Sequence, residues 1–187
     1  MKAGPEISMQ PLICSARLRL HPLRSDDFPA LLALWAEPDV GQYLGEGEAL
    51  TRAQWAVQLA AYAQMAPEGL GLWRVYRTAD GAALGCVSLK RGPRPETVEP
   101  AAMLHPRWRG QGYAEEALGA LLAHAAQALD AQGFVAHCSV PNQAGDRLLR
   151  RLGFVGCYEG DAGRFRVRQY RPGVRRSDSG LVTRLLR

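Results

Sequence analysis

Arg107-Trp108-Arg109-Gly110-Gln111-Gly112-Tyr113-Ala114 is the stretch of this 187-residue chain that decides its fold. Its two glycines stand two positions apart, directly ahead of an apolar repeat. The repeat consists of Leu118, Leu121, Leu122, Ala125 and Leu129. Positions spaced by three, four and seven residues share one face of a helix. We therefore predict a tight glycine loop that opens a long helix over residues 113–130.

A glycine loop ahead of a helix is suited to binding an anion. The first N–H groups of a helix lack partners within the helix and carry partial positive charge. Glycines let the backbone turn sharply and approach a ligand closely, as phosphate sites require. Arg107 and Arg109 could add charge-assisted hydrogen bonds. The loop lacks the Gly-Lys-Ser/Thr ending of a Walker loop, and Glu115 stands where a dinucleotide fingerprint needs Gly or Ala. An ordinary tight turn is the alternative.

Working outward from the loop, hydrophobic alternation and turn residues predict the remaining elements. Ser25 is expected to cap a first helix that ends before Pro38, and Thr51 with Gln54 forms a capping box for a second helix through about Met65. Strands are predicted over residues 17–21, 70–77, 83–90, 97–105, 134–140, 154–159 and 165–171, and a further helix over residues 143–152. Three consecutive strands disfavour a purely parallel, doubly wound sheet. We predict an α/β fold, with a mixed, mostly antiparallel central sheet flanked by helices.

Length and composition fit one globular domain. Hydrophobic residues make up 47% and charged residues 22% of the chain, which is an ordinary globular balance. No apolar run approaches the roughly 20 residues that span a bilayer, and residues 1–10 do not resemble a secretory signal. We expect a cytoplasmic protein without membrane contact. It would comprise a leader over residues 1–14, a domain over residues 15–171 and a basic extension over residues 172–187.

The net charge of +5 is concentrated at one end of the sequence. Eight arginines and one acid, Asp178, lie between Arg164 and Arg187, so this segment carries +7 and the rest of the chain −2. A nucleic-acid-binding protein more often spreads its basic residues along one helix or face. Nucleic acid is therefore an unlikely partner, although binding through the basic extension is one alternative function.

The cysteines and histidines do not form a metal-binding pattern. Their spacing contains no CxxC, HxH or HExxH motif, so we predict no metal site and no disulfide framework. The residues concerned are Cys14, Cys86, Cys138, Cys157, His21, His105, His124 and His137. Buried free thiols are the expected state of the cysteines.

The spacing Arg107-x-x-Gly110-x-Gly112 resembles the Gln/Arg-x-x-Gly-x-Gly/Ala motif of the GCN5-related N-acetyltransferases (GNATs). Downstream, Asn142-x-x-Gly145 with a short helix and Gly153-Phe154 resembles the second signature of that family. Upstream, residues 15–27 resemble the opening of the branch that contains ribosomal-protein N-acetyltransferases. The resemblance extends over residues 17–170, which is most of the chain.

This resemblance implies how coenzyme A would be bound. In GNATs the strand before the loop and the strand after the long helix splay apart, which here means residues 101–105 and 134–140. Backbone groups of Met103, Leu104 and His105 would hold the pantetheine arm, and Asn142 would hydrogen-bond to it. The diphosphate would lie on the loop formed by Arg107, Arg109, Gly110, Gln111, Gly112, Tyr113 and Ala114.

The resemblance also implies the reaction, which is transfer of an acetyl group from acetyl-CoA to a primary amine such as a protein N-terminus or a small molecule. Glu99 is the candidate base, since it stands where this branch often carries Glu. Leu149 and Gly145 replace the Tyr and Ser that donate a proton in relatives. Three alternatives are therefore a coenzyme A-binding domain without catalysis, the nucleic-acid-binding protein named above and a small oligomeric scaffold.

Two further expectations concern partners. Polar residues of the segment 41–48, including Glu46 and Glu48, could face a cationic acceptor. The closing strands often pair between copies in such folds, so a homodimer is possible.

Overall fold

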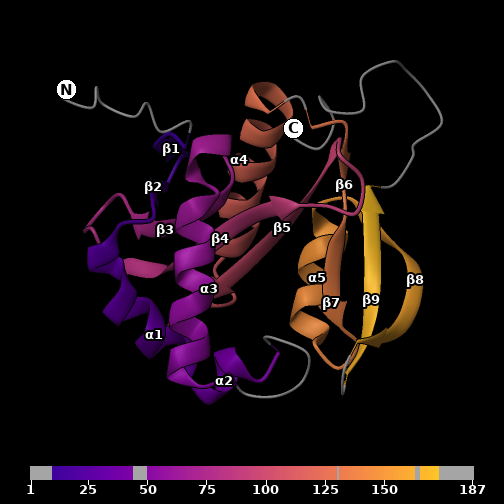
Figure 1. Ribbon diagram of the computed structural model, residues 1–187, viewed down its shortest axis with the longest axis horizontal. Helices are drawn as coiled ribbons and strands as arrows, with labels where there is room; N and C mark the ends of the chain where they lie inside the picture. The colour runs from indigo at the N-terminus through magenta and orange to yellow at the C-terminus, as the bar shows by residue number, and fades with distance from the viewer. Residues whose placement is uncertain (1–9, 44–49, 130, 163–164, 173–187) are drawn as a thin grey trace.

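The computed structural model describes residues 10–43, 50–129, 131–162 and 165–172. The strands are β1 (Ile13–Cys14), β2 (Leu18–Pro22), β3 (Gly71–Arg77), β4 (Ala83–Arg91), β5 (Thr97–Leu104), β6 (Gly133–Phe134), β7 (Ala136–Ser139), β8 (Phe154–Ala162) and β9 (Phe165–Pro172). The α-helices are α1 (Phe28–Ala36), α2 (Pro38–Gly41), α3 (Arg52–Gln64), α4 (Tyr113–Ala128) and α5 (Gln143–Arg151), and short 3₁₀ helices are η1 (Ser25–Asp27), η2 (Ala66–Glu68) and η3 (Pro106–Trp108). Figure 1 shows their arrangement.

The strands form two sheets. Six strands run in the order β1-β2-β3-β4-β5-β6, and three run in the order β7-β9-β8. Neighbours in the larger sheet are antiparallel except β5 and β6, which are parallel. This confirms the predicted mixed, mostly antiparallel α/β fold, with three consecutive strands β3, β4 and β5 at its centre.

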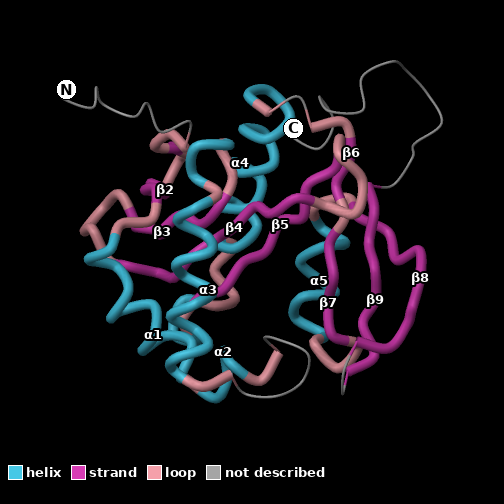
Figure 2. Tube along the Cα trace, viewed as in Figure 1, coloured by secondary structure: helices cyan, strands magenta, loops and turns pink. Residues whose placement is uncertain are grey.

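The chain passes from one sheet to the other at Val135. Pairing of β6 with β5 covers only Thr97 with Gly133 and Val98 with Phe134, followed by one bond from the Val135 N–H to the Val98 carbonyl. After this point β7 pairs with β9 instead. The single strand predicted over residues 134–140 is therefore wrong, because it is two strands in different sheets. Figures 1 and 2 show β5 and β7 diverging below β6.

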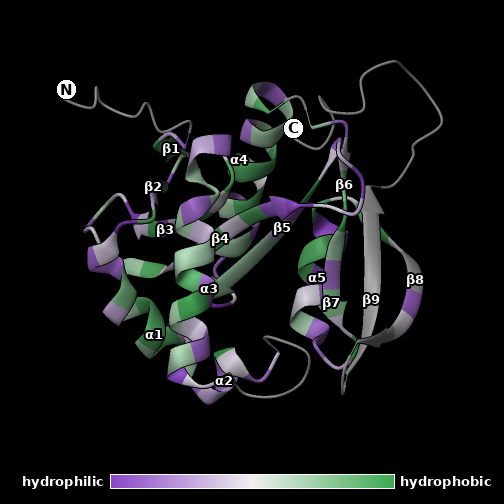
Figure 3. Cartoon of the chain, viewed as in Figure 1, coloured by the Kyte–Doolittle hydropathy of each residue, from purple (hydrophilic) through white to green (hydrophobic). Residues whose placement is uncertain are grey.

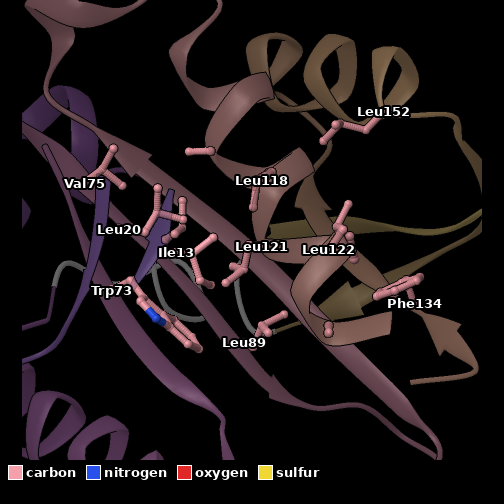
Figure 4. Close-up of a cluster of buried hydrophobic side chains, with 14 of the residues drawn as sticks. Ile13, Leu20, Trp73, Val75, Leu89, Leu118, Leu121, Leu122, Phe134 and Leu152 are labelled. Carbon is pink, nitrogen blue, oxygen red and sulfur yellow. The ribbon is translucent and has the colours of Figure 1, made fainter. Parts of the chain in front are cut away.

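Helices cover both faces of the larger sheet. On one face, α4 packs its leucines against side chains of β2, β3 and β4 in the main core (Figure 4). On the other face, α1, α2 and α3 pack on Leu72, Cys86 and Met103 in a second cluster. Figure 3 shows both apolar and polar residues on α4 and α5, as expected for amphipathic helices, whereas α1 is almost entirely apolar.

Several predicted element ends are confirmed. The capping box of Thr51 and Gln54 opens α3, and Gly112 directly precedes α4. Gly153 follows α5 with a left-handed φ of 82°, as expected of a residue just after a helix.

Other local expectations were wrong. The first helical segment is capped by Arg24 and not by Ser25, and Pro38, expected only to stop a helix, also starts α2. Before β1, the Gln10 side-chain amide donates to the Leu72 carbonyl, and Ile13 and Cys14 pair with β2. Residues 10–14 of the expected leader are therefore part of the folded domain. Cys14 is exposed, whereas Cys86 and Cys138 are buried free thiols.

Candidate active site

The loop before α4 presents an uncapped helix N-terminus. Gly110 and Gly112 have φ of 74° and 78°, a region that side-chain-bearing residues avoid. Gly112 is the N-cap residue, and no side chain of the described residues caps the first turn of α4. A Cβ on Gly110 would meet no atom within 4 Å. Glycine is therefore favoured here by its positive φ and not by lack of space, and the space next to it is open. Such a cluster of N–H groups binds anions well.

The turn between β1 and β2 supports the start of α4. Ser15 Oγ and the Arg17 backbone N–H each donate to Glu116 Oε1 at 2.7 Å. Arg17 Nε donates to Oε2 at 2.6 Å, and its guanidinium lies 4.5 Å from the centre of the Tyr113 ring. Burial acts to raise the pKa of Glu116, but these hydrogen bonds lower it overall. The acid on the first turns of α4 is thus neutralised by Arg17, which favours anion binding at the helix end.

Further arginines surround the loop. The guanidinium groups of Arg77 and Arg107 lie over the Trp108 ring, at 4.5 and 4.7 Å from its centre. Arg77 is paired with Asp80. In the described part of the chain, no acidic side chain pairs with Arg107 or Arg109. Two uncompensated cations therefore accompany the exposed N–H groups.

Arg109 also connects the loop to α2, one of the helices on the second face of the larger sheet, because its Nη2 donates to the Asp39 carbonyl at 2.8 Å. His105 acts as a cap for η3, since its Nδ1 accepts from the Arg107 backbone N–H at 3.3 Å. Gln111 donates its side-chain amide to the Arg107 carbonyl at 3.2 Å. These bonds fix the shape of the loop from within.

The edge of β5 that faces away from β4 is unpaired beyond Val98 among the described strands. We call residues 99–104 on this side the open edge. The Val98 carbonyl faces β6, and the His105 N–H faces β4, where it bonds to Leu84. Because strand groups alternate sides, Ala102 and Leu104 direct their N–H and C=O groups to the open edge. Met103 directs its N–H and C=O groups toward β4, and the His105 carbonyl accepts from the Trp108 N–H in η3.

Glu99 and His137 meet across the divergence of the two sheets. Glu99 comes from β5 and His137 from β7, and Glu99 Oε1 lies 3.0 Å from His137 Nδ1. The side chains are 30% and 38% exposed, respectively, so solvent reaches the pair. The hydrogen bond raises the pKa of His137, against the opposing effect of burial. The sequence alone did not indicate a role for His137, because no local pattern links it to Glu99, which lies 38 positions earlier.

Asn142 is the N-cap of α5, and its Oδ1 accepts from the Gly145 N–H at 2.9 Å. A Cβ on Gly145 would lie 2.7 Å from Cys138 Sγ and 2.9 Å from Asn142 Nδ2. Both distances are shorter than ordinary contact. The Cys138 thiol and the Asn142 amide thus occupy the space that a Ser side chain at position 145 would need, so a side chain there would have to displace them.

Leu149 and Ser139 matter for whether the site contains a proton donor. Leu149 is buried in the main core. Ser139 is also buried, and its hydroxyl has no hydrogen-bond partner among the described residues. It follows His137 by two positions on β7, so both side chains point to the same face.

The structure brings most of the predicted site residues to one region. Residues 107–114 form the loop, and Leu104 lies on the open edge. Glu99 lies on β5, and Asn142 lies between β7 and α5, on the other side of the divergence. Tyr113 is buried, and its hydroxyl accepts from Arg77 Nη1 at 3.4 Å, which indicates packing. The segment 44–49, with Glu46 and Glu48, lies outside the described residues.

Comparison with known proteins identifies the family. The model of the acetyltransferase (GNAT) domain matches residues 17–155. The chain belongs to the GNAT acetyltransferase family. Its GNAT fold is shared by an acetyltransferase from Agrobacterium tumefaciens, at 24% identity and a TM-score of 0.74 over 88% of this chain and 95% of that chain. No curated protein sequence matches this chain significantly.

Two other solved structures with this fold are ribosomal-protein acetyltransferases. One, from Salmonella typhimurium, modifies the N-terminal serine of the 50S subunit protein L7/L12; it is 20% identical, with a TM-score of 0.73 over 88% of this chain and 100% of that chain. The other is an L7/L12 α-N-protein acetyltransferase in complex with coenzyme A, at 21% identity and a TM-score of 0.73 over 86% of this chain and 97% of that chain.

The described residues lack both a metal-binding cluster and a membrane-spanning helix. They contain no group of three or more His, Cys, Asp or Glu side chains that could hold a metal ion. No helix among them has the length and apolar character needed to cross a bilayer.

Proposed function

We propose that this chain transfers the acetyl group of acetyl-CoA to a primary amine at the open edge of β5. One observation carries the proposal: an uncapped helix N-terminus with two left-handed glycines follows, after the short η3, a strand whose outer edge has no partner beyond Val98 among the described residues. The first feature suits a diphosphate, and the second suits the amides of an extended arm.

The residues present fit acetyl-CoA. The N–H groups from Gly110 to Ala114 would hold the diphosphate, with Arg107 and Arg109 adding charge. Ala102 and Leu104 would pair with the pantetheine amides, in place of the backbone groups of Met103, which face β4, and of His105, whose N–H bonds to Leu84 and whose carbonyl accepts from the Trp108 N–H. Asn142 has an Nδ2 donor for the arm, since the bond to Gly145 uses only its oxygen.

Glu99 is the proposed general base. An ammonium has no lone pair, so the acceptor must lose a proton before it can attack a carbonyl carbon. The N–H bond of the ammonium breaks, its proton passes to the Glu99 carboxylate, and the nitrogen keeps the electron pair. When bound, acetyl-CoA supplies the activated acyl group, a thioester whose C–S bond breaks as the new C–N bond forms. The nitrogen then loses a second proton to solvent, which leaves a neutral amide. Because Leu149 and Gly145 have no proton to donate, solvent would protonate the departing thiolate.

Protein N-termini are a fitting acceptor class to test first, because the relative from Salmonella typhimurium modifies an N-terminal serine. We include peptides beginning with Ser or Ala, together with a lysine side chain analogue and a polyamine. A reaction at the open edge requires only that the amine reach Glu99, which is 30% exposed.

Calorimetry on the purified protein tests the binding step. Wild type should bind acetyl-CoA, and Gly112→Glu should weaken binding by about 100-fold, because it places a carboxylate at the N–H cluster and charge-assisted bonds are worth about 1.5–3 kcal/mol each. Gly81→Glu is the matched control. Gly81 has a similar φ of 70° and open space around its Cβ, but it lies in a hairpin turn. Equal binding by all three proteins would refute the diphosphate site.

Turnover separates the proposal from its main alternative. Release of free coenzyme A thiol should depend on an amine from the panel and fall by at least tenfold in Glu99→Gln. Binding of acetyl-CoA without thiol release for any amine would favour a coenzyme A-binding domain without catalysis.

A further inference from the structure

Among the side chains that the structure describes, two possible cationic partners stand near Glu99, one on each side of its strand. On β4, Lys90 stands directly opposite Glu99 in the antiparallel register. Facing pairs on one side of a sheet bring their Cβ atoms to about 5 Å, so an ammonium there could reach the carboxylate. On β7, in the other sheet, His137 lies within hydrogen-bond distance.

The structure pairs Glu99 with His137 and not with Lys90. The Lys90 Nζ lies 5.2 Å from the centre of the Tyr62 ring, a distance at which a cation is attracted to the ring face. Tyr62 is itself buried, with its hydroxyl 3.4 Å from Ser88 Oγ. Lys90 is therefore held against Tyr62 of α3, and the Glu99 carboxylate lies on the other side of β5, next to His137 of β7.

The side chosen is the side where the chemistry must occur. The divergence between β5 and β7 begins directly after Val98, one residue before Glu99. A carboxylate that turned toward Lys90 would lie over the paired side of β5. A carboxylate bonded to His137 lies beside the open edge, where an acceptor amine would meet the acyl group.

We propose that His137 is a positioning residue, which holds the Glu99 carboxylate toward the open edge and away from Lys90. The proposal rests on the proposed function, in which Glu99 is the base. His137 acts through its δ nitrogen, which donates to Glu99 Oε1 and leaves the other carboxylate oxygen to accept a proton from the amine. The bond also explains the raised pKa of His137.

Steady-state kinetics with matched variants test this role. His137→Leu removes the donor and should lower kcat by at least tenfold, with the KM for acetyl-CoA within about twofold of wild type because the diphosphate loop is unchanged. His137→Asn keeps an N–H donor near the position of Nδ1 and should stay within about threefold of wild-type kcat. Adding Lys90→Met to His137→Leu removes the competing cation and should recover part of the lost kcat.

A second measurement does not depend on turnover. Titration of the His137 imidazole by NMR should give a pKa above the ordinary 6.5 in wild type, and a lower one in Glu99→Gln. Unchanged values would show that the pair does not form in solution and would overturn the proposal.

The kinetic outcomes distinguish the two proposals. If wild type turns over and His137→Leu matches its kcat, or if Asn and Leu lose activity equally, the role of His137 is overturned while acetyl transfer stands. If wild type binds no acetyl-CoA or transfers no acetyl group, the proposed function fails, and the role of His137 fails with it.

Discussion

A side chain at position 145 should cost less stability when Cys138 is made smaller. In Gly145→Ala the new methyl group would lie 2.7 Å from Cys138 Sγ, about 1 Å closer than ordinary contact. Overpacking of this kind costs about 1–3 kcal/mol. Replacing a helical Gly by Ala returns at most about 1 kcal/mol. We expect Gly145→Ala to lower the free energy of unfolding by about 1–2 kcal/mol.

The double variant isolates the cause. Cys138→Ala alone removes a buried sulfur and should cost about 1 kcal/mol, as for deletion of one methylene-sized group. In that background, Gly145→Ala no longer meets the sulfur, but the 2.9 Å approach of its Cβ to Asn142 Nδ2 remains, so its cost should shrink without vanishing. The coupling between the two positions should therefore reach about 1 kcal/mol, as residues in contact often show.

Urea unfolding followed by tryptophan fluorescence measures all four proteins of this cycle. Gly119→Ala in α4 is the control, because a Cβ there meets nothing within 4 Å, and it should stabilise the protein by up to about 1 kcal/mol. Additive effects at positions 138 and 145 would refute the steric argument. A cooperative result would explain why this chain lacks the Ser that relatives carry at position 145.

Three further outcomes can be checked by unfolding experiments. Because the folded pKa of His137 is raised, its stabilising contribution is complete below the unfolded pKa of about 6.5 and is lost as pH rises through the folded pKa; Glu99→Gln should abolish that loss in a pH series. Ser139→Ala should raise the unfolding free energy of the ligand-free protein by about 1 kcal/mol, since it removes a buried hydroxyl without a partner, and an equal or lower stability by calorimetry would contradict this. Asp27→Asn should cost about 3–5 kcal/mol in urea titrations, because it leaves the buried Arg74 without its 3.5 Å carboxylate partner, and a loss below about 1 kcal/mol would show the pair to be unimportant.

Local signals in the sequence predicted the parts of the fold that local chemistry determines. The capping box at Thr51, the glycines before α4 and Gly153 after α5 each act within a few residues, so their effects could be inferred without knowing the fold. The proposal that the loop binds an anion rests on the same local reasoning. The resemblance to the GNAT family then supplied the expectation of diverging strands.

The features that the sequence did not reveal depend on distant contacts. The apolar run of residues 134–140 reads as one strand, and its break at Val135 arises because β9 offers a pairing partner that lies about 30 residues further along the chain. The Glu99–His137 bond has the same origin. Pro38 did carry a local signal, since proline is favoured at the first position of a helix, and it starts α2 as well as ending α1.

The crossing at Val135 also bears on how the protein unfolds. Among the described residues, the backbone link at this point consists of a short parallel pairing and two further bonds, from the Gln132 N–H to the Glu96 carbonyl and from the Val135 N–H to the Val98 carbonyl. The unit of β7, β8, β9 and α5 should therefore undergo subglobal opening more readily than the larger sheet, with faster amide hydrogen exchange. A molecule bonded to β5 on one side and to Asn142 on the other would clamp both units, so that their amides would exchange through a single global event.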